Sequence, residues 1–234
     1  MKKVVNIGFF FLGAWVLTAL AVLFDLDGTL IDSLPDIAGV VNKIRVLHDL
    51  PPLANDTIGA FVGKGVEYLM ENTLEDVAEE MPMSDLVGLY RKHYSEFEFV
   101  GQLYPGVRET LESLRRHPEV RLGVVTNRLT DLAVKSVEHY LPGFEFDRIA
   151  GPDSVSRFKP YPEHIWEVLN TLQVKPDQAW FVGDHNVDRE CALRAGVSFL
   201  GAGYGLSGVQ VPNSQQLKQF GDLLNHLPNV ISEC

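Results

Sequence analysis

The chain has 234 residues, with 20 Lys and Arg against 31 Asp and Glu; its formal net charge is −11, and 46% of it is hydrophobic. This length and composition suit one large or two smaller globular domains, and they exclude disordered, collagen-like and coiled-coil chains. The acidic balance argues against a bulk nucleic-acid binder, which needs a basic surface. Two cysteines, Cys191 and Cys234, are too few for a disulfide framework, so we expect a cytoplasmic, reducing environment.

The N-terminal region contains an uncharged run of 21 residues, 4–24. Its last residues, 22–24, predict a buried parallel strand, because strands covered on both faces are continuously apolar. The strand needs about five residues before Asp25, which leaves about 16 residues of the run, fewer than the roughly 20 that a membrane span requires. Residues 1–20 are therefore an apolar extension with three open interpretations: a non-native extension from an upstream start codon, an additional packed segment, or a membrane anchor through residues 4–20.

Residues 35–99 are predicted to be wholly helical, because apolar residues recur there at helical spacing and Pro and Gly separate the helical runs. Ser33 is predicted to cap the first of these helices, with Pro35 in its first turn. The stretch holds 5 Lys and Arg against 12 Asp and Glu, so it carries −7 of the −11 charge.

From Tyr104 onward the pattern changes to alternating helices and strands, which is typical of a doubly wound, Rossmann-like parallel sheet with helices on both faces. We therefore predict an α/β core, residues 21–34 and 100–234, interrupted after its first strand by an α-helical cap, residues 35–99. The later strands are predicted at 122–125, 148–150, 179–182 and 198–201, and helices near 106–114, 131–140, 165–172 and 188–195.

Polar residues lie at or beside the ends of several predicted strands, where open parallel sheets bind their ligands. Taken alone, each group is ordinary turn or helix-start chemistry. Their occurrence in order beside strands of one predicted sheet favours a functional site. The groups are Asp25 and Asp27, Thr126 and Asn127, Lys159 with Pro160, and Asp184 with Asp188.

Carboxylates that converge from different strands need a cation to stay ionised, and hard oxygen ligands favour Mg²⁺. A bound metal in turn keeps one carboxylate available as a nucleophile. Lys159 is a point cation suited to the charge of a transferring phosphoryl group, and Thr126 offers a hydroxyl to phosphate oxygens. The pattern predicts Mg²⁺-dependent phosphate chemistry.

These groups resemble the four ordered motifs of the haloacid dehalogenase superfamily. The resemblance rests on Asp25-Leu26-Asp27-Gly28-Thr29-Leu30, which is highly specific, and on the three later groups. The predicted helical insert is similar to that superfamily's small α-helical cap. The likeness extends from Ala21 to about residue 205 and leaves out the extension before it.

The resemblance implies a role for each matching residue. Asp25 would be the nucleophile that forms an aspartyl-phosphate, and Asp27 the general acid and then the general base. The carboxylates of Asp25 and Asp184, with the main-chain carbonyl of Asp27, would hold Mg²⁺. The remaining implied roles are phosphate binding by Thr126, Asn127 and Lys159, and a place in or near the metal's second coordination sphere for Asp188.

An acid at Asp27 favours hydrolysis of phosphate esters, or a phosphomutase, within that superfamily. Residues 61–66 and 203–205 look most like those of phosphoglycolate phosphatases, which implies a small phosphorylated substrate. Lys64 is either a contact to the substrate's carboxylate when the cap closes or a solvated loop lysine. The alternatives are a sugar-phosphate phosphatase, a β-phosphoglucomutase and, more remotely, a non-catalytic binding protein on the same fold. No pattern indicates an oligomeric state.

Overall fold

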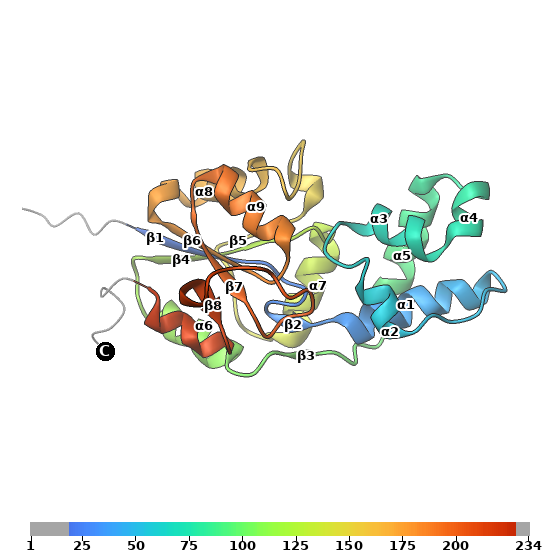
Figure 1. The fold of residues 1–234 in the computed structure, drawn as a ribbon, viewed down its shortest axis with the longest axis horizontal. Helices are drawn as coiled ribbons and strands as arrows, with labels where there is room; N and C mark the ends of the chain where they lie inside the picture. The colour runs from blue at the N-terminus through green and yellow to red at the C-terminus, as the bar shows by residue number, and fades with distance from the viewer. Residues whose placement is uncertain (1–18, 228–234) are drawn as a thin grey trace, which may run out of the picture.

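The computed structural model describes residues 19–227. Its core holds a sheet flanked by helices, and a group of helices forms a cap at one end of the core (Figure 1). The core strands are β1 (Leu20–Phe24), β4 (Val120–Val125), β5 (Arg148–Ala150), β6 (Ala179–Gly183), β7 (Ser198–Ala202) and β8 (Gln216–Leu217). The core helices are α6 (Val107–Arg115), α7 (Thr130–Tyr140), α8 (Glu163–Leu172) and α9 (Asn186–Ala195).

Within residues 19–227, six strands form a parallel sheet in the order β5-β4-β1-β6-β7-β8. Strand β1 lies at its centre, where Phe24 is in register with Val124 of β4 and Val182 of β6. This arrangement explains the apolar sequence of β1, since all five of its residues are buried or partly buried. The predicted doubly wound α/β fold is confirmed.

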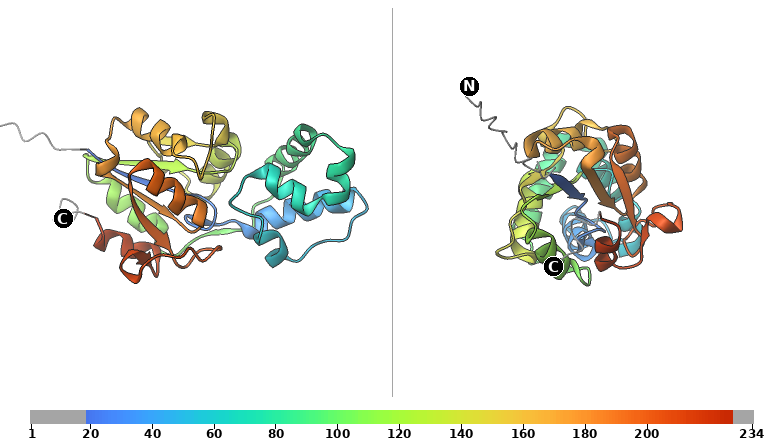
Figure 2. Two further views of the ribbon diagram at one scale, coloured as in Figure 1. Left: turned by 45° about the horizontal axis from the view of Figure 1, so that its top comes forward. Right: turned by 90° about the vertical axis from the view of Figure 1, so that its left-hand side faces the viewer.

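Helices cover both faces of the sheet, as the two views of Figure 2 show. Successive side chains of β1 point to opposite faces. Val22 and Phe24 pack with residues of α6, α7 and the 3₁₀ segment Phe220–Asn225, whereas Ala21 and Leu23 pack with residues of α8 and α9. The nucleophile position predicted at Asp25 therefore follows a strand that is held from both sides.

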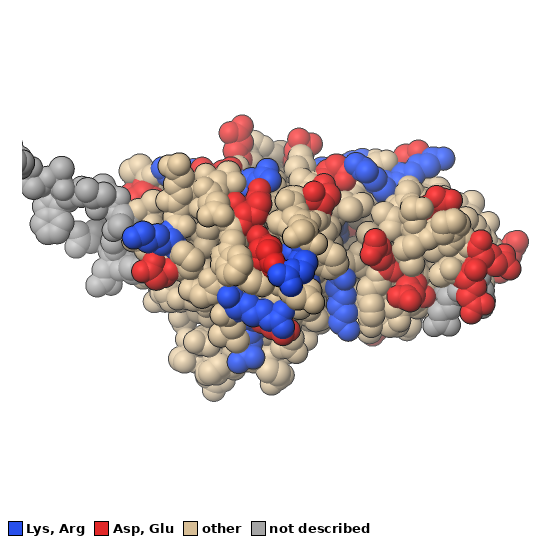
Figure 3. Space-filling model, turned by 90° about the horizontal axis from the view of Figure 1, so that it is seen from above, with Lys and Arg blue, Asp and Glu red and all other residues tan. Residues whose placement is uncertain are grey.

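The cap is helical, as predicted, and has its own apolar core. Ile44 and Met70 are fully buried in it, and Leu132 of α7 joins the same cluster and ties the cap to the core. Acidic side chains gather at the end of the cap farthest from the core (Figure 3). The cap helices are α1 (Leu34–Leu47), α2 (Asn55–Gly59), α3 (Val66–Thr73), α4 (Glu75–Glu80) and α5 (Met83–Ser95).

Two short strands, β2 (Ile31–Asp32) and β3 (Gln102–Leu103), join the cap to the core as an antiparallel pair. Beside them the buried Asp36 carboxylate accepts hydrogen bonds from the main-chain N–H groups of Val100 (2.7 Å) and Gly101 (2.9 Å) and from the Tyr140 hydroxyl (2.5 Å). The Asp36 carboxylate, at the start of α1, therefore joins α7 to the segment that leads from the cap back into the core.

Several local expectations differ from the structure. Ser33 precedes α1, but its side chain makes no capping hydrogen bond; its hydroxyl instead donates to the Asp27 carboxylate. Strands β2, β3 and β8 were not expected. Most of the apolar extension, residues 1–18, lies outside the described residues, and Leu20 already belongs to β1. In the described part of the chain, no helix combines the length and apolar character needed to cross a membrane.

Candidate active site

The candidate site lies at the carboxyl ends of the three central strands. Asp25 directly follows β1, Thr126 follows β4, and Asp184 follows the last residue of β6. Because β1 pairs in parallel with both neighbours, these residues emerge at one edge of the sheet, and all three are buried. The structure therefore brings together residues that the sequence spreads over 160 positions.

Lys159 links two of the buried carboxylates. Its Nζ atom donates hydrogen bonds to Oδ1 of Asp25 and Oδ1 of Asp188, each at 2.7 Å, and its side chain is 1% exposed. Burial alone would lower the lysine's pKa, but the two carboxylates outweigh that effect and raise it, so Lys159 is a fixed cation. Burial and the charge of Asp188 raise the pKa of Asp25 well above its ordinary value, although Lys159 opposes them.

Asp184 is held by main chain and by glycines. Its Oδ2 accepts a hydrogen bond from the N–H of Ser207 at 2.9 Å. A Cβ atom on Gly28 would lie 2.4 Å from that oxygen, and one on Gly205 would lie 2.4 Å from the Asp184 Cβ, so both positions need glycine. Burial, followed by the charge of Asp188, raises the pKa of Asp184 to about 7.

Asp188 also begins a helix. His185 is the N-cap residue of α9, with its Nδ1 accepting from the N–H of Val187, and Asp188 Oδ2 accepts from the N–H of His185 at 2.9 Å. The other Asp188 oxygen is the one that accepts from Lys159. Each oxygen of the Asp188 carboxylate therefore accepts a hydrogen bond from the protein. The His185 N–H holds the carboxylate in place, and the carboxylate in turn positions the Lys159 amine.

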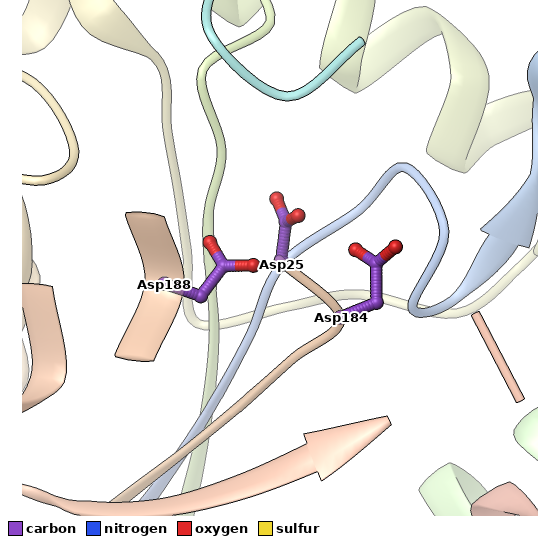
Figure 4. A group of neighbouring side chains, drawn as sticks. All are labelled: Asp25, Asp184 and Asp188. Atoms are coloured by element: carbon purple, nitrogen blue, oxygen red, sulfur yellow. The ribbon is translucent and has the colours of Figure 1, made fainter. Parts of the chain in front are cut away.

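The three buried aspartates form a group suited to a divalent cation. Oxygen atoms from Asp25, Asp184 and Asp188 lie within 4.8 Å of one another. Figure 4 shows Asp25 after β1, Asp184 after β6 and Asp188 in α9, with the Asp188 carboxylate directed toward Asp25. Three carboxylates with one lysine leave an excess of negative charge in a buried place, and carboxylate oxygens are ligands that Mg²⁺ prefers. The donor set fits Mg²⁺.

Asp27 lies beside this group but has a different partner. Its carboxylate accepts hydrogen bonds from Arg128, at 3.0 Å from Nε to Oδ2 and 2.5 Å from Nη2 to Oδ1, and from the Ser33 hydroxyl. Arg128 was not predicted as a site residue. Its place next to Thr126 and Asn127 is the signal in the sequence that points to it.

A cavity between the core and the cap opens onto these residues. Asn127, a core residue, spans the boundary, because its side-chain amide donates to the carbonyl oxygens of Gly63 in the cap (2.9 Å) and Lys159 in the core (3.0 Å). The cap side of the cavity is mainly apolar. Its lining comprises Asp25, Asp27, Thr126, Asn127, Arg128, Leu129 and Leu132 from the core and Ile37, Phe61, Val62, Gly63, Gly65, Val66, Leu69 and Tyr90 from the cap.

Lys64 does not line this cavity. Its side chain is exposed, and its Nζ lies 4.6 Å from the centre of the Tyr68 ring and 3.4 Å from the Tyr68 hydroxyl. The structure therefore places Lys64 on the cap surface, on the same loop as Gly63, and its contact with a substrate stays a prediction.

The comparisons with known proteins agree on one family. The model of the haloacid dehalogenase-like hydrolases matches residues 22–202. The chain is 35% identical over 219 residues to a plasmid-encoded phosphoglycolate phosphatase of Cupriavidus necator, covering 91% of this chain and 93% of that protein. It is also 35% identical over 215 residues to a phosphoglycolate phosphatase of Aquifex aeolicus, with 91% and 98% coverage.

The fold has solved counterparts as well. A crystal structure described as a predicted phosphoglycolate phosphatase from Haemophilus somnus superposes with a TM-score of 0.79 at 27% identity, covering 91% of this chain and 99% of that one. The likeness therefore includes the cap as well as the core.

Proposed function

The chain belongs to the haloacid dehalogenase-like hydrolase family, and we propose that it is a Mg²⁺-dependent phosphatase of small phosphate monoesters, with 2-phosphoglycolate as its substrate. The observation that carries this proposal is the buried group of Asp25, Lys159, Asp184 and Asp188, of which Asp25 lines the cavity between the core and the cap. The names of the relatives at 35% identity support the substrate.

Asp25 is the proposed nucleophile. Lys159 holds one of its oxygens, and the other attacks the phosphorus atom while the bond from phosphorus to the ester oxygen breaks. The product of this step is an aspartyl-phosphate on Asp25. Thr126, Asn127 and Lys159 are the proposed contacts to the phosphate oxygens, where the lysine's charge offsets that of the transferring group.

Asp27 is the proposed general acid and base. It is two residues from the nucleophile and lines the same cavity. In the first step its carboxyl group gives a proton to the departing ester oxygen, and in the second it takes a proton from the water that attacks the aspartyl-phosphate. This cycle returns both aspartates to their starting state and releases inorganic phosphate.

Mg²⁺ would be held by the carboxylates of Asp25 and Asp184 and the main-chain carbonyl of Asp27, and it supplies positive charge that offsets the phosphate and keeps Asp25 ionised. The hydrogen bonds of Asp188 support a positioning role, since both its oxygens already accept from protein donors. The cap excludes water from the cavity while the phosphoryl group transfers. We place this activity in the cytoplasm, in keeping with the buried free thiol of Cys191.

The test is phosphate release with Mg²⁺ over a panel of small phosphate monoesters. We expect 2-phosphoglycolate to give the highest kcat/KM and Asp25→Asn to abolish release with the fold intact. Asp131→Asn, which changes an exposed aspartate of α7, is the matched control and should keep the activity. Comparable rates on many esters would contradict the narrow substrate assignment, and full activity of Asp25→Asn would contradict the nucleophile.

A further inference from the structure

We propose that Arg128 binds a carboxylate on the leaving-group side of the substrate. In this structure Arg128 binds the Asp27 carboxylate, and the substrate carboxylate would take its place. This inference rests on the proposed phosphatase function and adds a residue that selects the substrate. It concerns the end of the substrate that is not transferred, whereas Lys159 and Thr126 are the proposed contacts to the phosphate.

Arg128 is a preformed receptor for a carboxylate. Its side chain is 5% exposed, and its guanidinium carbon lies 4.5 Å from the centre of the Tyr94 ring. Its Nη1 donates to the Ser136 hydroxyl at 2.9 Å, and the Tyr94 hydroxyl lies 3.0 Å from the same oxygen. The guanidinium fork is therefore fixed on one side and presents Nε and Nη2 together, the arrangement that suits a two-oxygen ligand.

The cavity offers no other cation to such a ligand. Among the described residues that line it, Arg128 is the one basic side chain, and the cap contributes mainly apolar groups such as Phe61 and Leu69. A carboxylate buried there without a partner is strongly disfavoured. Within the cavity, the anionic end of a small substrate therefore has Arg128 as its cationic partner.

Exchange at Arg128 also affects Asp27. When the substrate carboxylate takes the Nε and Nη2 donors, Asp27 loses its two hydrogen bonds from Arg128 and keeps the one from Ser33. A substrate that carries the right second anion would thus release the proposed acid and base, and a neutral ester would not. Recognition and catalysis are coupled through one arginine.

The experiment compares two esters that differ only at the far end, 2-phosphoglycolate and 2-hydroxyethyl phosphate. We expect the wild-type protein to prefer the carboxylate-bearing ester. Arg128→Gln should reduce the ratio of the two kcat/KM values by roughly 100-fold, the size of effect expected when hydrogen bonds to a charged partner are lost. Arg128→Lys keeps a buried positive charge but lacks the paired donors of the guanidinium. The ratio for this variant should therefore lie between those of the wild type and Arg128→Gln. This variant also supplies the comparison if the glutamine variant does not fold.

Arg91→Gln is the matched control, because Arg91 forms an exposed ion pair with Asp131 away from the cavity. Its ratio should equal that of the wild type. If Arg128 had a purely structural role, its substitution would lower kcat/KM for both esters by the same factor and leave their ratio unchanged. That result would overturn the inference. A wild-type protein with equal kcat/KM for the two esters would overturn it as well. Failure of the wild type to release phosphate from either ester would refute the proposed function instead.

Discussion

The side-chain amide of Asn127 in the core donates a hydrogen bond to the carbonyl oxygen of Gly63 in the cap at 2.9 Å. The same amide also donates to the carbonyl oxygen of Lys159, so one group touches the cap loop and the segment that carries the buried lysine. The position of the cap is thereby tied to the candidate phosphate site.

Asn127→Ala removes both of these hydrogen bonds. We expect a loss of roughly 1–3 kcal/mol in the free energy of unfolding, because carbonyl oxygens are left unpaired, together with a lower kcat/KM. Urea unfolding and steady-state kinetics measure the two effects. Asn72→Ala, which removes a hydrogen bond within the cap, should lower stability alone; a similar loss of kcat/KM there would remove the special role of Asn127.

Lys159→Met removes the cation between Asp25 and Asp188. Breaking a buried ion pair from one side costs roughly 3–5 kcal/mol, so the midpoint of urea unfolding should fall markedly, and phosphate release should be lost. Lys175→Met changes an exposed lysine and serves as the control. A Lys159→Met protein as stable as the wild type would show that the two carboxylates do not need this charge.

The aspartate group should make the effect of Mg²⁺ depend on pH. The pKa of Asp184 is raised to about 7 in the folded protein, against an ordinary value of about 3.9. The folded state then binds more protons than the unfolded state between these values, so stability should fall as the pH rises through that range. We expect Mg²⁺ to bind in place of the proton, so the rise in Tm on adding Mg²⁺ should be larger at pH 8 than at pH 6.

Asp184→Asn provides the control for this pH effect. The amide carries no charge, so the variant should lose much of the Mg²⁺-dependent rise in Tm and the difference between the two pH values should shrink. Equal Mg²⁺ effects at pH 6 and pH 8 in the wild type would contradict the prediction.

Asp36→Ala tests the joint between the cap and the core. It leaves the N–H groups of Val100 and Gly101 and the Tyr140 hydroxyl without their acceptor, so the free energy of unfolding should fall by roughly 3 kcal/mol. Asp36→Asn keeps an acceptor oxygen and should lose less. Urea unfolding measures both, and equal losses in the two variants would show that the acceptor itself is unimportant.

Strong periodic patterns made much of this fold predictable. Strand β1 and the aspartate after it were found because a strand buried on both faces is continuously apolar. Strands β2, β3 and β8 have two residues each and therefore no pattern that a sequence can display. The cap helices were expected as a region, since their apolar spacing is clear, although the sequence does not show which core helix they contact.

The candidate site was predictable where a residue's role depends on its place at a strand end. Asp25 and Asp184 belong to that class. Ser33 was wrongly expected to cap α1, because its hydroxyl donates instead to the Asp27 carboxylate, six positions earlier. Arg128 was missed because its partner Asp27 lies 101 positions away in the sequence and only the folded chain brings the two together.

The antiparallel pair of β2 and β3 has a consequence for how the cap can be changed. Asp32 and Gln102 are direct partners, so the chain leaves the core and re-enters it at neighbouring points. Loops between the cap helices can change in length without moving a strand of the main sheet, because the ends of the insert stay fixed by their own ladder. A different lid could be grafted at these two positions while the aspartates and Lys159 remained where they are.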